Sequence, residues 1–150
     1  MRGACERIAV INLPERTDRR RAMAAEMRRI GLSLDAPPVT LFPATRFSSA
    51  GDWPSIGARG CFASHFAVLE NARRDGLESV AILEDDVMWT RSLLRASRAD
   101  LDALSAAPWR VLHGGAPDDR RSEGRIGAAP LKPDVDVLTS HFVAFRGDAI

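Results

Sequence analysis

The sequence has no tyrosine, one lysine and two cysteines, and it contains no long apolar run. Cys5 and Cys61 lie far apart in a chain that is long enough to fold without crosslinks. The sequence therefore favours reduced thiols and a cytoplasmic location over a disulfide framework. No segment has the length of a membrane span, so any membrane contact is expected to be peripheral, at the inner face of the membrane. The charged stretch that follows Pro14 is not expected in a signal peptide.

Neither sign of charge dominates, because 21 basic residues are balanced by 20 acidic ones and the net charge is +1. This balance argues against nucleic acid as a partner, since the molecule as a whole has no field that would attract it. Any anion site must be local. With 150 residues, of which 45% are hydrophobic, the chain is expected to form one globular domain, residues 1–150, with a substantial core.

Short apolar runs alternate with segments of helical spacing along the chain. Strands are expected at residues 7–13, 39–44, 79–84, 109–113 and 137–145. Helices are expected from Thr17, as an N-cap, to Ile30, from about Gly60 to Asp75, and over residues 91–107 as one broken or two short helices. This alternation predicts an α/β fold with a mostly parallel sheet and helices on both of its faces. Such sheets bind ligands beyond the carboxyl ends of their strands.

Three carboxylates, Glu84, Asp85 and Asp86, follow the apolar run at residues 79–83. Side chains alternate along a strand, so Glu84 and Asp86 are expected to face together while Asp85 points away or into the turn. Two ionised carboxylates on one side repel each other unless a divalent cation lies between them. Oxygen ligands of this kind suit Mg²⁺ or Mn²⁺. The alternative is a solvated acidic turn after the strand.

Charged residues also follow the first expected strand. The residues at the end of this strand and the start of the next helix include Asn12, Arg16, Asp18, Arg19 and Arg20. Backbone N–H groups at a helix N-terminus favour an anion, and a guanidinium can hold a phosphate through two hydrogen bonds. The sequence therefore predicts a phosphate site in this turn. The alternative is a solvated helix face whose arginines pair with neighbouring acids.

Ser64 and His65 fall in the first turns of the helix expected from Gly60. A histidine in such a place is more often a packing or capping residue than a catalyst, and we expect His65 to shape a substrate pocket. Cys61 has apolar neighbours and is expected to be buried and inert. Helical spacing also gives this helix one shared face of Phe62, Phe66 and Leu69.

Three stretches with these features follow one another: IAVINLPERTDRR, GARGCFASHFAVLENA and AILEDDV. Together they resemble the glycosyltransferases of family 25, which include bacterial lipooligosaccharide galactosyltransferases and the collagen galactosyltransferase domain. The resemblance runs from Ile8 through WRVLHGG to SHFVAFRGDAI. It implies a GT-A type, Rossmann-like fold and transfer of a hexose, with galactose favoured, from a UDP-sugar to a saccharide acceptor of cell-surface polysaccharide, with inversion. It also implies Mn²⁺ or Mg²⁺ as a cofactor.

The resemblance implies roles for residues of all three motifs. Asp86 is the implied metal ligand, assisted by Glu84 or Asp85. The implied contacts to the nucleotide sugar come from Asn12, Arg16, Arg19, Asp85, Ser64 and His65. Inversion also needs a general base, for which Asp118 and Asp119 are candidates by position only, in a segment that otherwise resembles a solvated loop.

Two departures from the family pattern leave other interpretations open. The family domain normally continues past Ile150, so the chain is expected to be truncated at its C-terminus. Relatives often carry a tyrosine in the last strand, where this chain has Phe142 and Phe145. The chain could therefore be a catalytically weak remnant that binds a nucleotide or another protein. A receiver-type signalling domain is a further alternative, but such domains carry acids after the first strand, where this chain carries arginines.

Overall fold

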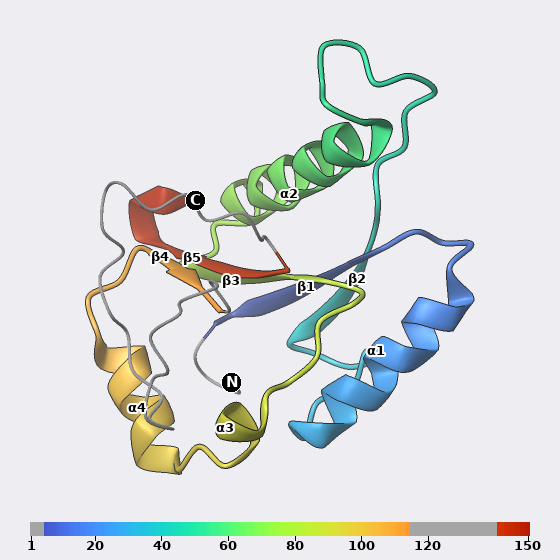
Figure 1. Cartoon of the computed structure of the whole chain (residues 1–150). Coiled ribbons are helices and arrows are strands. Elements are labelled where there is room, and N and C mark those ends of the chain that lie inside the picture. Colours follow the sequence, from blue (N-terminus) through green and yellow to red (C-terminus); the bar gives the residue numbers. More distant parts are fainter. Residues whose placement is uncertain (1–4, 115–140) are drawn as a thin grey trace.

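Five strands form one sheet in the order β2-β1-β3-β5-β4 (Figure 1). The computed structural model describes residues 5–114 and 141–150. Its strands are β1 (Arg7–Asn12), β2 (Val39–Pro43), β3 (Ser79–Glu84), β4 (Val111–His113) and β5 (Phe142–Arg146). β1 pairs in parallel with β2 and β3, whereas β5 runs antiparallel to β3 and β4. The predicted α/β fold with a mostly parallel sheet is confirmed.

Helices cover both faces of the sheet, as predicted. α2 (Ile56–Arg74) lies on one face, and α1 (Thr17–Arg29), α3 (Arg91–Leu94) and α4 (Arg98–Ala106) lie on the other (Figure 1). The helical region expected at residues 91–107 is therefore two short helices. A short 3-10 helix, η1 (Gly147–Ala149), follows β5.

The apolar runs of β1 and β3 are buried from both sides, which explains why they lack the polar alternation of a surface strand. Their alternate residues enter two separate core clusters. The cluster on the α1 side includes Ile8, Val10, Met23, Met27, Ala81 and Leu83. The cluster on the α2 side includes Ala9, Ile11, Val68, Ala72, Val80 and Ile82. The register of the two strands pairs Ile11 with Glu84, so Asn12 and the acidic triplet emerge at the same edge of the sheet.

Two helix starts differ from the prediction. α2 begins at Ile56, before Gly60, because Ser55 caps it. The Ser55 hydroxyl accepts a hydrogen bond of 3.0 Å from the N–H of Ala58, which satisfies one of the free donors of the first turn. At the other helix, Thr17 is the first helical residue of α1 rather than its N-cap. Arg16 holds the N-cap position there and makes no side-chain capping bond.

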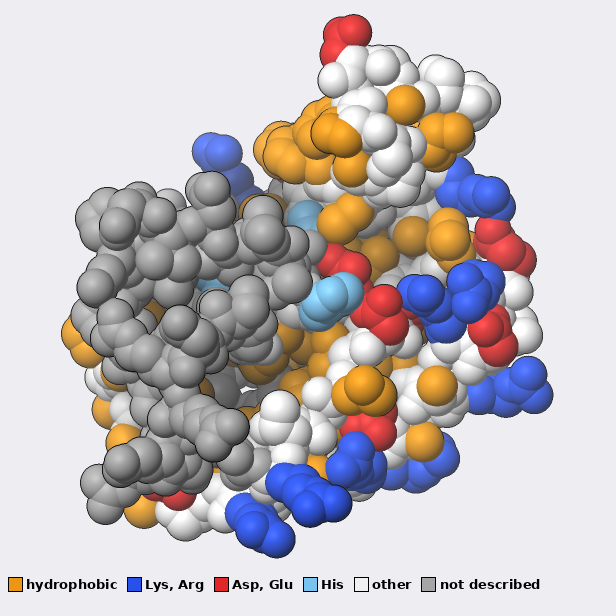
Figure 2. Space-filling view, viewed as in Figure 1, with side chains coloured by type: hydrophobic (Ala, Val, Ile, Leu, Met, Phe, Trp, Pro, Cys, Tyr) orange, Lys and Arg blue, Asp and Glu red, His pale blue; other side chains and the backbone are white. Residues whose placement is uncertain are grey.

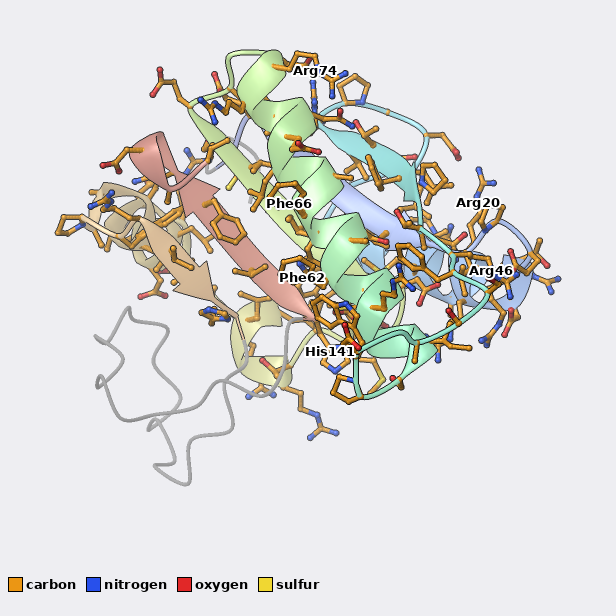
Figure 3. All side chains as sticks on the ribbon, turned by 90° about the horizontal axis from the view of Figure 1, so that it is seen from above. Arg20, Arg46, Phe62, Phe66, Arg74 and His141 are labelled. Carbon is orange, nitrogen blue, oxygen red and sulfur yellow. The ribbon has the colours of Figure 1, made fainter. Side chains whose placement is uncertain are left out.

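The face of α2 that packs on the sheet is not the aromatic one. Phe62 and Phe66 are 56% and 53% exposed and lie along the outer side of the helix (Figure 3). The ring of Trp53 lies beside Phe62, with ring centroids 4.9 Å apart. The buried residues of the helix are mostly small: Gly60, Ser64, Val68 and Ala72. Small side chains at a spacing of four residues let the helix approach the sheet closely.

Gly60 is where α2 comes closest to the neighbouring backbone. A Cβ atom at this position would lie 2.8 Å from the carbonyl oxygen of Thr45, just after β2. We expect Gly60→Ala to lower the free energy of unfolding by about 1–3 kcal/mol, because helix and loop must move apart. The measurement is urea denaturation.

A second glycine in the same helix provides the control for this substitution. A Cβ atom on Gly57 has its nearest neighbour, Ser55 Oγ, at 3.7 Å, which is ordinary contact. Alanine is more favourable than glycine inside a helix, so Gly57→Ala is expected to stabilise the protein by up to about 1 kcal/mol. If Gly60→Ala stabilised the protein as well, the close approach of α2 to the loop after β2 would be wrong.

Candidate active site

A cavity of about 330 Å³ opens at the edge of the sheet where β1 and β3 end. Its walls come from the turn after β1, the loop after β2, the first turns of α2 and the end of β3. Motifs that are far apart in the sequence therefore meet at one place, as expected at the carboxyl ends of parallel strands. Figure 2 shows acidic and histidine side chains next to arginines on this side of the molecule. A cavity of this size can accept part of a small-molecule ligand.

Asp85 is held by two residues from the region between β1 and α1. It is only 8% exposed. One carboxylate oxygen, Oδ2, accepts a hydrogen bond of 2.7 Å from Nδ2 of Asn12, and Oδ1 accepts one of 2.9 Å from Nη1 of Arg19. The hydrogen bond to Asp85 raises the pKa of the Arg19 guanidinium above its ordinary value. Asp85 thus connects the acidic triplet to the arginine-bearing turn.

Glu84 and Asp86 face His141, the residue that precedes β5. Nδ1 of His141 lies 2.9 Å from Oδ1 of Asp86 and 3.5 Å from Oε2 of Glu84. One potential ligand atom from each of the three residues lies within 4.8 Å of the other two. In Figure 3, His141 lies near the N-terminal end of α2. Glu84 and Asp86 therefore share one side, as the strand alternation predicts, and the three residues could hold a divalent cation.

Arg19 and Arg16 both line the cavity, but they have different partners. Nη1 of Arg19 contacts the triplet a second time, 3.2 Å from Oδ2 of Asp86. Arg16 is paired with Asp18, whose carboxylate accepts hydrogen bonds of 3.0 and 2.8 Å from Nε and Nη2. The hydrogen bonding from Arg16 lowers the pKa of Asp18 below its ordinary value. An exposed pair of this kind contributes little to stability, so Arg16 can exchange Asp18 for another anion.

Ser64 is fully buried and connects α2 to the loop after β2. Its hydroxyl donates a hydrogen bond of 2.7 Å to the carbonyl oxygen of Gly60 and accepts one of 2.8 Å from the N–H of Thr45. These bonds fix the cavity wall between the two segments. The predicted contact of Ser64 with the nucleotide sugar stays a prediction.

His65 and Cys61 line the cavity beside Glu84. Nε2 of His65 lies 3.4 Å, and Sγ of Cys61 lies 3.5 Å, from Oε1 of Glu84. Burial alone would lower the pKa of His65, but its neighbours Cys61 and Glu84 more than offset burial and raise the pKa to about 9. The expectation that Cys61 is buried is wrong, because Cys61 is only partly buried and belongs to the cavity wall. That its thiol is inert stays a prediction.

Comparison with protein-family models identifies the family. The model described as glycosyltransferase family 25 (LPS biosynthesis protein) matches residues 5–113. The chain belongs to glycosyltransferase family 25. This membership supports a glycosyltransferase of LPS biosynthesis with a sugar donor and an acceptor, and it replaces the receiver-type interpretation. No curated protein matches the sequence.

The structure of this family 25 chain adds two site residues, His141 and Arg46, to those found from the motifs. His141 meets the acidic triplet because β5 runs antiparallel to β3, which brings the start of β5 beside the end of β3. Arg46 lines the cavity from the loop after β2 and forms an ion pair with Glu15. Arg46 lies two residues after the apolar run at residues 39–44, near the carboxyl end of β2 where ligands bind, and that position was an available signal. His141 offered no such signal, because it precedes β5 and the direction of β5 is not evident from the sequence.

Other predictions about the family 25 chain concern residues and partners that this structure does not test. Asp118 and Asp119 lie outside the described residues, so their candidacy as the general base stays a prediction. Within residues 5–114 and 141–150, no helix combines the length and the apolarity that a membrane span requires.

Proposed function

We propose that this family 25 chain transfers a hexose, with galactose favoured, from a UDP-sugar to a saccharide acceptor of cell-surface polysaccharide, with inversion at the anomeric carbon. One observation carries the proposal: Arg19 connects the turn after β1 to both Asp85 and Asp86 at the wall of a single cavity. A sugar nucleotide needs cationic groups for its phosphates, and a divalent ion commonly accompanies it. Residues suited to both tasks lie together here.

Arg16 and Arg19 bind the diphosphate of the donor in this proposal. Both line the cavity, and the backbone N–H groups at the start of α1 add positive potential beside them. The Arg16 guanidinium forms an ion pair with Asp18 in the structure. When the donor binds, its diphosphate takes the place of the Asp18 carboxylate. Asn12 acts indirectly in this proposal. Its amide donates hydrogen bonds to Asp85 and to the carbonyl oxygen of Arg16, and the first of these keeps the Asp85 carboxylate aligned with Arg19.

Glu84, Asp86 and His141 are the residues that fit this divalent cation, because their ligand atoms lie within 4.8 Å of one another, and Glu84 also lines the cavity. Two carboxylates and an imidazole favour Mn²⁺ over Mg²⁺, which prefers a shell of oxygen atoms. When bound, such an ion supplies Lewis-acid stabilisation of the negative charge that develops on the departing UDP. Arg19 stabilises the same charge from the side of α1.

Inversion requires that a general base remove a proton from the acceptor hydroxyl while the sugar carbon is attacked from the opposite face. Asp118 and Asp119 stay the candidates for this base. The proposed place of the reaction is the cytoplasm, at the inner face of the membrane, where the thiols of Cys5 and Cys61 would stay reduced.

The proposal is tested by thermal unfolding with UDP and Mn²⁺ together. At a UDP concentration about a hundredfold above its Kd, we expect the melting temperature to rise by about 5–10 °C. Asp86→Ala is expected to abolish the part of this rise that depends on Mn²⁺, because the ion loses a carboxylate ligand. Asp35→Ala is the control, since Asp35 is an exposed carboxylate outside the cavity.

The outcome separates the proposed enzyme from a remnant. An unchanged shift in Asp86→Ala would contradict the metal site. A normal shift in the wild type, without hydrolysis of UDP-sugar and without transfer to any saccharide, would indicate a domain that binds the nucleotide but does not turn it over.

A further inference from the structure

A second set of potential metal ligands lies on the α2 side of Glu84. Cys61 and His65 are four residues apart on α2, so their side chains project from the same face of the helix. Both reach Glu84 at the end of β3, and one ligand atom from each of the three residues lies within 4.8 Å of the other two. Unlike the set around Asp86, this one contains a thiol. The two sets therefore differ in chemistry although they share a residue.

The distances within this set match the edges of a tetrahedral zinc site. With Zn–S bonds of about 2.3 Å and Zn–N and Zn–O bonds of about 2.0–2.1 Å, the S···O and N···O edges are about 3.6 and 3.4 Å. The observed distances to Oε1 of Glu84 are 3.5 Å from Sγ of Cys61 and 3.4 Å from Nε2 of His65. Two edges of the site therefore agree with tetrahedral zinc, and the third, between Sγ of Cys61 and Nε2 of His65, is within 4.8 Å.

The environment also favours a cation. Nε2 of His65 is buried and, within the described part of the chain, makes no hydrogen bond, although it lies close to Glu84. At 3.4 Å from the carboxylate this nitrogen has only a long polar contact, and a metal bond would hold it more strongly. Both Cys61 and His65 line the cavity, so an ion can enter from it.

We propose that Cys61, His65 and Glu84 form a zinc site, with three protein ligands and a fourth position open to the cavity. Thiolate and imidazole ligands select Zn²⁺ over Mg²⁺ or Mn²⁺, which prefer oxygen. The zinc site is thus distinct from the set formed by Glu84, Asp86 and His141, which contains no thiol and for which the proposed ion is Mn²⁺. Zinc binding itself does not depend on the proposed transferase reaction.

Sharing of Glu84 makes the two sites compete. Its Oε1 atom faces Cys61 and His65, whereas its Oε2 atom lies 3.5 Å from His141. Zinc at Oε1 withdraws electron density from the carboxylate that the manganese site shares, and two cations on one carboxylate repel each other, so bound zinc is expected to weaken manganese binding. Inhibition of sugar transfer by zinc follows from this competition, and that consequence rests on the proposed function.

Cobalt(II) is the probe for the zinc site, because a cobalt–thiolate bond gives a charge-transfer absorption band that oxygen and nitrogen ligands do not give. The reduced wild-type chain is expected to show this band with equimolar Co²⁺ and to lose it when Zn²⁺ is added. Cys61→Ser is expected to lack the band and to bind zinc at least about 100-fold more weakly, since even outer-shell partners change metal affinity by about 10–100-fold. Cys5→Ser is the matched control and should retain the band.

Two further variants separate the zinc site from the manganese site. His65→Gln is expected to weaken zinc binding as Cys61→Ser does, whereas Asp86→Asn is expected to leave the zinc affinity unchanged while it lowers the response to manganese. Melting curves without metal show that each variant is folded. Absence of the band in the wild type, its persistence in Cys61→Ser, or loss of zinc affinity in Asp86→Asn would overturn the proposal. None of these results depends on sugar transfer.

Discussion

An Asp86→Asn variant is expected to transfer sugar more slowly than the wild type by a factor on the order of 10²–10³. Asparagine keeps the size of the side chain but removes a charge from the set that faces His141 and Arg19. A weakened cation site loses stabilisation of the charge that develops on UDP, an effect that is absent from the ground state and so acts on kcat. The measurement is UDP release with a saccharide acceptor at saturating UDP-sugar.

Manganese dependence shows whether the lost rate comes from the metal site. Raising the Mn²⁺ concentration should restore part of the activity of Asp86→Asn if the defect is weak metal binding. Asp35→Asn removes an exposed carboxylate that pairs with Arg20 and does not line the cavity, so this variant should keep the wild-type rate of transfer. A rate for Asp86→Asn within a factor of about two of the wild-type rate would show that Asp86 is not a ligand of the metal ion.

The second large effect is expected on stability, from Asn12→Asp. Asn12 is 3% exposed and donates its hydrogen bond to Asp85, which is itself buried. A carboxylate in its place cannot donate when ionised, and it sets two negative charges against each other beside Arg19. We expect the free energy of unfolding at neutral pH to fall by about 3 kcal/mol or more. Urea denaturation over a range of pH measures the effect.

The sign of the pH dependence distinguishes charge repulsion from a simple loss of packing. The folded variant binds a proton between its two carboxyl groups more tightly than the unfolded chain does. Its stability relative to the wild type should therefore recover as the pH falls and decline as the pH rises. Asn12→Ala, which removes the hydrogen bond without adding charge, is expected to cost about 1–3 kcal/mol. Equal pH profiles for Asn12→Asp and Asn12→Ala would contradict the contact between Asn12 and Asp85.

The strands could be predicted from the sequence because β1 and β3 are buried on both faces and form unbroken apolar runs. The inward face of α2 could not be predicted in the same way. Phe62 and Phe66 have helical spacing, and so do the buried residues of the helix. The buried residues are Gly60, Ser64, Val68 and Ala72. Spacing alone does not say which of these two faces packs on the sheet. The contact between Gly60 and Thr45 decides it, and that contact joins residues from different elements.

The meeting of Arg19 with the acidic triplet could also be anticipated, because parallel neighbours end at one edge of a sheet. The common side of Glu84 and Asp86 followed from strand alternation. His141 could not be found in this way, because its place beside Asp86 requires β5 to run antiparallel to β3, a direction that local spacing does not encode. Cys61 was misjudged because its apolar sequence neighbours point elsewhere on the helix.

The central claim is that the arginines after β1 and the acids after β3 serve one ligand. The most direct test is the rise in melting temperature caused by UDP with Mn²⁺ in Arg19→Met and Arg20→Met, each compared with its own curve without ligand. Arg19 contacts both Asp85 and Asp86, whereas Arg20 lies one position along and reaches Asp35. We predict that Arg19→Met loses most of the rise and that Arg20→Met keeps it. A full rise in Arg19→Met would contradict the claim.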